Sequence, residues 1–328
     1  MSRKSATDAL LGDPSSVLPF RAGTGFYNPE TAKAFFKAHG KKAEFPAGTI
    51  LFLENEKSKK KSIFKQPLAK ALKTPVKEAL FAPKRIHRMF FLVSGEVALT
   101  QGGRLLHKAQ PGDVFGEMAV ISELPDPEFD AVRTATAEAT EDCVAYSLDG
   151  SEVQEGLRKK PEFVLMLLSV MFERLRFLAN KLSAKGDDAD ESTSRHRSRK
   201  AESILDPEML QALKDKLDVA TVVHFQEGKK ILKAGVSGTT MYVVLEGQVA
   251  VAIGRKIVEK IEAGGFFGEM ALVDQLPRTA TAVARSDCSL LPINREALVK
   301  LVKSEPDFAM ALMRSVAQRL RYMNSLFG

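Results

Sequence analysis

Cysteine and histidine are scarce in this sequence, and long apolar runs are missing from it. Two of the 328 residues are cysteine, and the five histidines are scattered without a His-x-x-x-His pair, so we expect no protein-bound metal. No apolar run approaches the roughly 18 residues that a membrane span needs. The segment Met1 to Phe20 also lacks the apolar core of a signal peptide. These absences predict a soluble cytoplasmic protein.

The positive charge of the chain is concentrated in one segment. The formal net charge is +7 at pH 7, which by itself would suggest a nucleic-acid partner. However, the segment 55–88 contains eleven Lys or Arg and two Glu, and the rest of the chain is slightly acidic. We predict two short helices there, at 67–73 and 75–82, each with an apolar face and a lysine face. Such an element would suit an acidic protein, a polyanion or an anionic membrane; the alternative is a surface excursion that exposes lysines.

Two copies of one sequence pattern make up most of the chain. The copies are 152 residues apart in the first part of the pattern and 145 residues apart in the second part. The matches at 152 are Met89 to Val97 with Met241 to Val249, and Phe115 to Ala119 with Phe267 to Ala271. The matches at 145 are Arg133 to Ala137 with Arg278 to Ala282, Cys143 with Cys288, and Arg174-Leu175-Arg176 with Arg319-Leu320-Arg321.

Two insertions distinguish copy one from copy two. The first adds 28 residues before Met89 and accounts for the lysine-rich segment. The second adds seven residues, Asp126 to Val132, between Pro125 and Arg133, where copy two joins Pro277 directly to Arg278.

Cys143 and Cys288 occupy equivalent places in the two copies, each after an aspartate and before apolar residues. This position favours buried structural thiols in two different domains. A disulfide or a reactive thiol is the alternative.

Each copy is expected to combine short strands with flanking helices. Asn28-Pro29 and Asp206-Pro207 are helix-start signals. Apolar residues recur every three or four positions after Pro306, which predicts a long amphipathic helix, equivalent to one that starts at Pro161. The expected strands of copy two are Thr221 to Phe225, Lys230 to Lys233, Met241 to Leu245, Gln248 to Ile253, Lys256 to Ile261, Ala280 to Ala284 and Cys288 to Ile293. This density of short strands predicts a mainly β fold, a sandwich, jelly roll or barrel.

The repeats and the composition divide the chain into four parts. We expect an N-terminal tail and helix at 1–40, a first domain at 41–183 with the lysine-rich insert at 55–88, a polar linker at 184–203 and a second domain at 204–328. The linker passes from acidic to basic residues without apolar periodicity. Its basic end, Arg195 to Lys200, has the composition of a kinase substrate or docking motif, although a solvated linker explains it more simply.

The stretch from Phe267 to Thr281 carries the clearest chemistry. Arginine offers a planar fork that matches two phosphate oxygens, and backbone N–H groups at a short helical turn can add to it. Glu269 lies beside that turn and cannot face a phosphate without repulsion, whereas it can accept hydrogen bonds from hydroxyl groups. Arg278 follows nine positions later. One arginine and one glutamate in this layout predict a site for a sugar phosphate.

The pattern Phe-Gly-Glu-Met-Ala-Leu followed by Arg-Thr-Ala resembles the phosphate-binding cassette of cyclic-nucleotide-binding domains. The resemblance implies two tandem β-barrel or jelly-roll domains of this family, each a candidate for cAMP or cGMP. It also implies that Glu269 holds the ribose 2′-hydroxyl, that Arg278 holds the cyclic phosphate, and that Thr279 stands where a hydroxyl can bond a syn guanine. The candidate ligand-binding residues of copy two are Phe267, Gly268, Glu269, Met270, Ala271, Arg278, Thr279 and Ala280. Those of copy one are Gly116, Glu117, Met118, Ala119, Arg133, Thr134 and Ala135.

Copy one departs from the family pattern. In simple register Asp126 takes the place of Arg278, and Glu128 and Asp130 bring two more acids near the expected phosphate. The residues from Arg133 onward match copy two, so Arg133 is the alternative phosphate ligand. A working first site and an inactive one are both open.

No catalytic set is visible, neither a Ser/His/Asp arrangement nor a glycine-rich triphosphate loop. We therefore expect a receptor that binds and does not turn over its ligand, needs no cofactor, and signals in trans to an unknown effector protein by movement of its C-terminal helices. The apolar helix after Pro306 also suggests a homodimer, and the end at Gly328 leaves no room for a DNA-binding domain. A scaffold protein with degenerate pockets is the main alternative, and an enzyme on a jelly-roll barrel is a weaker one.

Overall fold

The computed structural model describes residues 26–57, 87–123, 132–184, 199–200, 205–216, 222–274 and 276–326. They form two compact units, one made of Lys33–Gln154 and the other of Met1–Ala32 with Glu155–Gly328. The helices expected at 67–73 and 75–82, the acidic insertion at 126–131 and the basic residues 195–198 lie outside the described residues. The domain boundaries given above therefore stay a prediction.

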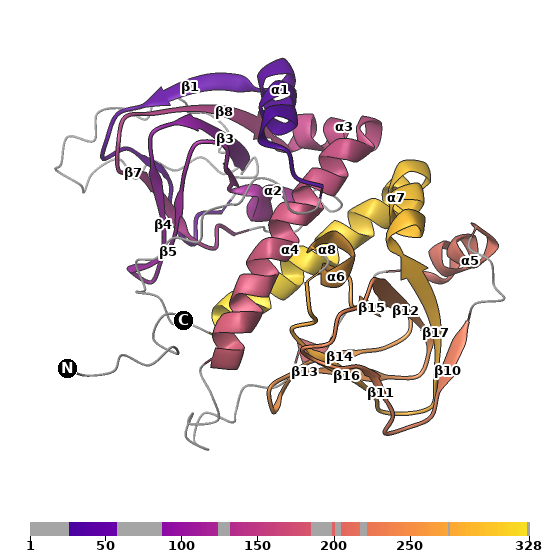
Figure 1. Ribbon diagram of the computed structural model, residues 1–328. Coiled ribbons are helices and arrows are strands. Elements are labelled where there is room, and N and C mark those ends of the chain that lie inside the picture. The colour runs from indigo at the N-terminus through magenta and orange to yellow at the C-terminus, as the bar shows by residue number, and fades with distance from the viewer. Residues whose placement is uncertain are drawn as a thin grey trace, which may run out of the picture. The chain divides into compact units, whose positions relative to one another are not determined.

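The unit Lys33–Gln154 contains two four-stranded antiparallel sheets (Figure 1). One has the order β1-β8-β3-β6 and the other β2-β7-β4-β5. Phe90 stacks on Phe115 with ring centroids 5.2 Å apart, and Phe52 lies against both, which fills the space between the sheets. The strands are β1 Lys41–Phe45, β2 Ile50–Phe52, β3 Arg88–Ser94, β4 Val97–Gln101, β5 Arg104–Ala109, β6 Val114–Phe115, β7 Thr136–Ala139 and β8 Cys143–Asp149.

Three helices accompany these sheets. Helix α2 spans Glu117–Glu123, while α1 (Pro29–His39) and α3 (Gly150–Lys159) run across the boundary between the units. The side chain of Asn28 accepts hydrogen bonds from the N–H groups of Glu30 and Thr31, which confirms it as the cap of α1.

The second unit repeats the same two-sheet arrangement. Its sheets have the orders β10-β17-β12-β15 and β11-β16-β13-β14-β9. The strands are β9 Arg199–Lys200, β10 Val223–Phe225, β11 Lys230–Leu232, β12 Thr240–Glu246, β13 Val249–Ile253, β14 Lys256–Ile261, β15 Phe266–Phe267, β16 Thr281–Ala284 and β17 Cys288–Asn294. The helices are α4 Pro161–Ala184, α5 Pro207–Lys216, α6 Met270–Asp274, α7 Arg295–Ser304 and α8 Pro306–Ser325. The expected mainly β fold with flanking helices is confirmed.

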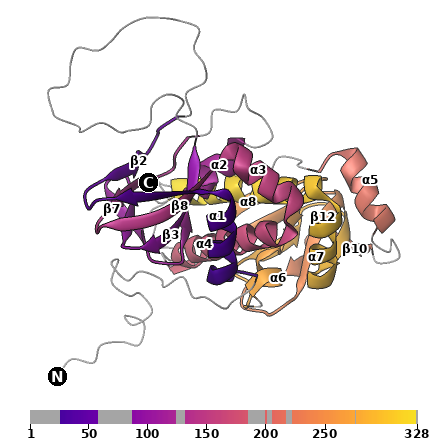
Figure 2. The same cartoon turned by 90° about the horizontal axis from the view of Figure 1, so that it is seen from above.

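Helix α4 belongs to copy one by sequence, yet it packs in the unit of copy two. It lies beside α8 in Figures 1 and 2, and it also contacts α6 and α7. The apolar stripe of α8 is buried within this unit. Its members are Phe308, Leu312, Val316, Leu320 and Met323. Because these side chains already have neighbours, the stripe gives no support for the homodimer that the sequence suggested.

The strand predictions for copy two agree with the structure at all seven places, and two short strands were missed. β15 is only two residues long, and β9 lies inside the expected linker, where it pairs in parallel with β14. Both cysteines are free and buried, and they fall in different units, as expected for structural thiols. Among the described helices, none has the length and apolar character needed to cross a membrane.

Candidate ligand-binding site

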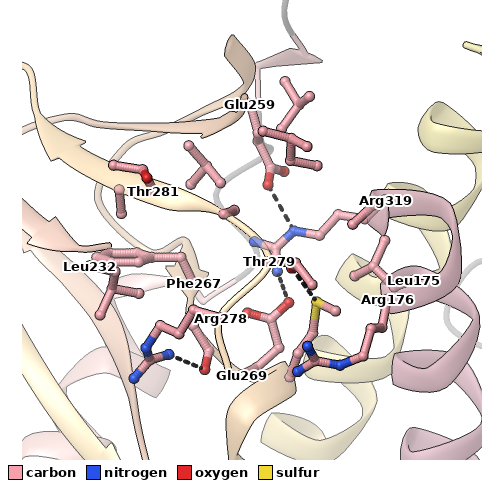
Figure 3. Close-up of a pocket in the computed structure, with 18 of the residues that line it drawn as sticks. Leu175, Arg176, Leu232, Glu259, Phe267, Glu269, Arg278, Thr279, Thr281 and Arg319 are labelled. Atoms are coloured by element: carbon pink, nitrogen blue, oxygen red, sulfur yellow. Dashed lines mark hydrogen bonds and ion pairs between the residues drawn. The ribbon is translucent and has the colours of Figure 1, made fainter. Parts of the chain in front are cut away.

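The unit of copy two contains a cavity with an empty volume of about 760 Å³, counting the part open to solvent. Strands β13 and β14 form its apolar wall with Val251, Ile253 and Val258. The start of β16, which pairs with β13, continues this wall, and the turn around α6 together with α4 and α8 contributes the rest (Figure 3). Every candidate residue of copy two lines this cavity, from Phe267 to Ala271 and from Arg278 to Ala280.

Arg278 is held by the backbone at the edge of the cavity. Its Nη1 donates to the carbonyl of Gly268 at 3.0 Å, and its Nη2 donates to the carbonyl of Thr240 at 2.6 Å. Burial lowers the pKa of the Arg278 guanidinium from its ordinary value, although the nearby Glu269 acts against this. A partly desolvated cation next to a cavity favours an anionic ligand, because a ligand anion would restore the lost solvation.

Two glycines let the chain approach this guanidinium. Gly268 has φ +83°, and a Cβ there would lie 2.9 Å from Arg278 Nη1. A Cβ on Gly238 would lie 2.8 Å from Nη2 of the same arginine. The glycine of the Phe-Gly-Glu pattern is thus needed both for its backbone conformation and for the space that the arginine fills.

Glu269 is bound by a residue that the sequence analysis did not identify as part of the site. Arg319 of α8 donates from Nη1 to Glu269 Oε1 at 2.5 Å and from Nε to Glu259 Oε2 at 2.8 Å. Its Nη2 donates to the carbonyl of Phe266, and the guanidinium lies over the Phe266 ring, 4.8 Å from the centroid. Burial opposes the charge of Arg319, but the two carboxylates outweigh it and raise the pKa. The glutamate therefore pairs with α8, and Arg278 bonds to carbonyls, so the two site residues do not simply pair with each other.

A third arginine reaches the site from α4. Arg176 lines the cavity, and its Nη1 donates to the carbonyl of Pro277 at 2.7 Å, one residue before Arg278. Arg176 and Arg319 belong to the repeated Arg-Leu-Arg pattern, although they are not equivalent positions in it. The repeated pattern was the available signal for both arginines, whereas Glu259 gave no signal beyond its place in a strand.

Smaller side chains complete the surroundings of the turn. The hydroxyl of Thr279 lies 3.9 Å from the sulfur of Met270, and the ring of Phe267 stacks on Tyr242 with centroids 5.6 Å apart. Met270 is also the first residue of α6. The packing of this turn is thus fixed by residues within the repeated motif.

Copy one keeps the arginine geometry despite its insertion. Arg133 Nη1 donates to the carbonyl of Gly116 and Nη2 to the carbonyl of Arg88, each at 2.8 Å. These are the sequence equivalents of the two carbonyls that Arg278 binds. Thr134 likewise lies 3.9 Å from the sulfur of Met118, and Glu117 is fully buried. Asp126, which competed with Arg133 for this place, lies outside the described residues.

The geometry suits a small ligand with one anionic group and adjacent hydroxyls. Arg278 can meet the anion, the carboxylate of Glu269 can accept from a hydroxyl, and the apolar wall can hold a flat ring. The described residues contain no group of three or more His, Cys, Asp or Glu that could hold a metal ion.

The sequence profile of one protein family matches both copies. The family is described as "Cyclic nucleotide-binding domain", and its profile matches residues 75–160 and 222–305. The matched segments together cover slightly more than half of the 328 residues.

Two curated proteins illustrate the relatives of this chain. The cGMP-dependent protein kinase of Eimeria tenella is 29% identical over 218 residues, which cover 65% of this chain and 18% of the kinase. The cAMP-dependent protein kinase regulatory subunit of Yarrowia lipolytica is 25% identical over 216 residues, which cover 65% of this chain and 48% of the subunit. The chain thus spans between about a fifth and about half of the length of these two relatives.

Solved structures of similar proteins were also found. The regulatory domain of Toxoplasma gondii PKA with cAMP is 19% identical, with coverage of 87% of this chain and 89% of that one and a TM-score of 0.27. The catabolite activator protein of Thermus thermophilus is 28% identical, with coverage of 38% and 62% and a TM-score of 0.33. Both TM-scores are below 0.5, so the assignment of the family comes from the sequence profile.

Proposed function

The chain belongs to the cyclic nucleotide-binding domain family, and from this premise we propose that it is a regulatory receptor whose second domain binds cAMP or cGMP. The observation that carries this proposal is that Arg278 and Glu269 line one cavity, with Arg278 fixed by two backbone carbonyls. Arg278 is assigned to the cyclic phosphate and Glu269 to the ribose 2′-hydroxyl. The other ligand-binding residues of the second domain are those of the repeated motif, Phe267 to Ala271 with Thr279 and Ala280.

We propose that the first domain also binds a nucleotide, at a first site in which Arg133 is the phosphate ligand. The support is that Arg133 makes the same pair of carbonyl hydrogen bonds as Arg278. Gly116, Glu117, Met118, Ala119, Thr134 and Ala135 would surround the ligand there. Because His107 takes the place of Glu259 in copy one, we expect unequal affinities at the two sites.

Titration calorimetry of the full chain with cAMP and with cGMP tests the proposal. We expect saturable binding, and Arg278→Ala should weaken the second site by about 2–5 kcal/mol, as for the loss of one partner of a buried charge pair. Arg285→Ala, an exposed arginine on the surface of the same domain, is the matched control and should leave binding unchanged. If the binding that remains in Arg278→Ala is lost when Arg133→Ala is added, that binding belongs to the first domain. Wild-type protein that binds neither nucleotide would exclude this function.

Ligand binding is proposed to act on α8. A ribose hydroxyl on Glu269 changes the partners of the carboxylate that Arg319 holds, and Arg319 is part of α8. A ligand shifts such an equilibrium only by its different affinity for the two states. Hydrogen exchange of α8 with and without nucleotide measures the coupling, and equal exchange rates in the two conditions would contradict it.

The signal is proposed to pass to a separate effector protein, and the relatives make a protein kinase the first class to test. We propose a binding protein without catalytic turnover, since the site offers an arginine and a carboxylate for recognition rather than an activated nucleophile. The alternative of a scaffold with degenerate pockets predicts no nucleotide binding at all.

Contact of the basic insert with a polyanion or an anionic membrane stays a sequence-based prediction, and affinity that does not fall with salt would exclude it.

A further inference from the structure

Glu259 of β14 is a second carboxylate in the cavity, and neither the repeated motif nor the proposed phosphate and ribose contacts use it. Glu259 is 6% exposed, lines the cavity, and accepts a hydrogen bond from Arg319 Nε at 2.8 Å. In the sheet it stands opposite Val251. A buried carboxylate loses its hydration, which lowers the stability of the fold, so a role beyond packing is worth testing.

The fold itself does not require an acid at this position. In copy one the equivalent place on β5 is occupied by His107, opposite Leu99, the equivalent of Val251. His107 Nε2 lies 3.2 Å from Asp113 Oδ2, and Gly265 takes the place of Asp113 in copy two. The same strand position therefore carries an imidazole in one unit and a carboxylate in the other.

The position of Glu259 places it at the base of the proposed ligand. In Figure 3, Arg278 and Glu259 lie on opposite sides of the cavity, with the contact between Arg319 and Glu269 between them. If the phosphate lies on Arg278 and the ribose on Glu269, as in the proposed function on which this inference rests, the base extends toward Glu259. There it meets the apolar side chains Val251 and Val258 on the same two strands.

We propose that Glu259 is a specificity-determining residue that favours a purine with a 6-amino group over one with a 6-oxo group. An ionised carboxylate only accepts hydrogen bonds. Adenine presents the N6 amino donor at its 6-position, whereas guanine and hypoxanthine present the O6 acceptor there. An O6 acceptor facing the carboxylate would leave a buried polar group unpaired, which is more costly than a merely absent contact. The second site therefore selects cAMP over cGMP.

Three nucleotides separate this effect from that of Thr279. cAMP and cIMP differ at the 6-position, where the amino group is replaced by a carbonyl and N1 gains a proton, while cIMP and cGMP differ only by the 2-amino group. For the full chain carrying Arg133→Ala, which leaves the second site to be measured, we expect cAMP to bind about tenfold or more tighter than cIMP. Glu259→Gln keeps an acceptor for Arg319 and adds an amide donor, so the cAMP to cIMP affinity ratio should fall close to one. Thr279→Ala should change only the cGMP to cIMP ratio.

The outcomes are distinct. An unchanged cAMP to cIMP ratio in Glu259→Gln, or an equal loss for all three nucleotides, would overturn the proposal and make Glu259 only a support for Arg319. A wild-type ratio near one would overturn it without any variant, and Glu259→His, which introduces the side chain found in copy one, repeats the test if Glu259→Gln does not fold. If the wild-type second site binds none of the three nucleotides, the proposed function fails and not only the role of Glu259.

Discussion

Arg319 on α8 and Glu269 on the turn before α6 are joined by a buried hydrogen bond of 2.5 Å between Nη1 and Oε1. The same guanidinium reaches Glu259 at 2.8 Å, so one cation pairs with two carboxylates from two different segments of the chain. The proposed ribose ligand and the C-terminal helix thus share one ion-pair cluster. Any ligand that hydrogen-bonds to Glu269 must therefore change the interaction between Glu269 and Arg319 of α8.

Replacing Arg319 with methionine should destabilise the unit that contains it. Methionine fills much of the space but leaves Glu259 and Glu269 buried without their cation, and breaking a buried pair costs about 3–5 kcal/mol. Urea unfolding measures the loss. The triple variant Glu259→Gln, Glu269→Gln, Arg319→Met removes all three charges and should recover much of the stability. A loss below about 1 kcal/mol for Arg319→Met would show that the cluster is well solvated.

Gly268→Ala should weaken nucleotide binding more than it weakens the fold. The added Cβ would lie 2.9 Å from Arg278 Nη1 and 3.2 Å from the carbonyl of Thr240. The guanidinium of Arg278 is the partner that can move, so the group proposed to hold the phosphate is displaced. Gly254→Ala is the matched control, because Gly254 has φ +59° and no atom within 4 Å of a Cβ. Both variants should lose about 1–2 kcal/mol of stability from the left-handed backbone, but only Gly268→Ala should lose affinity.

Arg176→Ala should weaken binding at the second site by a few fold. Arg176 braces the carbonyl of Pro277, and the next residue, Arg278, is further fixed by a hydrogen bond from its own N–H to the carbonyl of Val236 at 3.1 Å. One charge-assisted hydrogen bond that is partly exposed is worth about 1 kcal/mol. Calorimetry of Arg176→Ala, Arg176→Lys and the exposed α4 control Asn180→Ala measures the effect. Lysine should restore part of the affinity, and equal affinities in all three variants would contradict the bracing role.

The parts of this protein that the sequence predicts are those that repeat. The strands, the caps at Asn28 and Asp206, and the Phe-Gly-Glu turn with its arginine nine positions later could be recognised, because each has a local pattern and occurs twice. The equivalence of Arg133 and Arg278 is harder to recognise from the sequence, because a simple alignment that ignores the seven-residue insertion places Asp126 opposite Arg278. The structure supports the equivalence, because both arginines donate to the same two carbonyl positions of the repeat.

What the sequence could not predict depends on contacts between distant segments. Glu259 and Arg319 are 60 positions apart, and nothing local distinguishes a buried acid on a strand from a solvent-facing one. Helix α4 was assigned to copy one, whereas its packing on α6 and α8 puts Arg176 next to the second site. Tertiary packing, and not periodicity, decides which helix closes which cavity.

The carboxylate of Glu96 should make the unit Lys33–Gln154 sensitive to acid. It accepts hydrogen bonds from Lys108, Thr140 and Gln110, each at 2.8 Å, and the bond from Lys108 is the main reason that its pKa lies below the ordinary 4.5. As the pH falls below 4.5, Glu96 of the unfolded chain takes up a proton before Glu96 of the folded chain does. The stabilisation that the ionised carboxylate gives above pH 4.5 is therefore lost progressively as the pH falls toward the lower pKa of the folded state. Glu96→Gln should therefore be less stable than wild type by about 1 kcal/mol near pH 7, and the difference should shrink as the pH is lowered toward 3. The exposed Glu138→Gln is the control, and a stability difference for Glu96→Gln that is independent of pH would contradict the role of its charge.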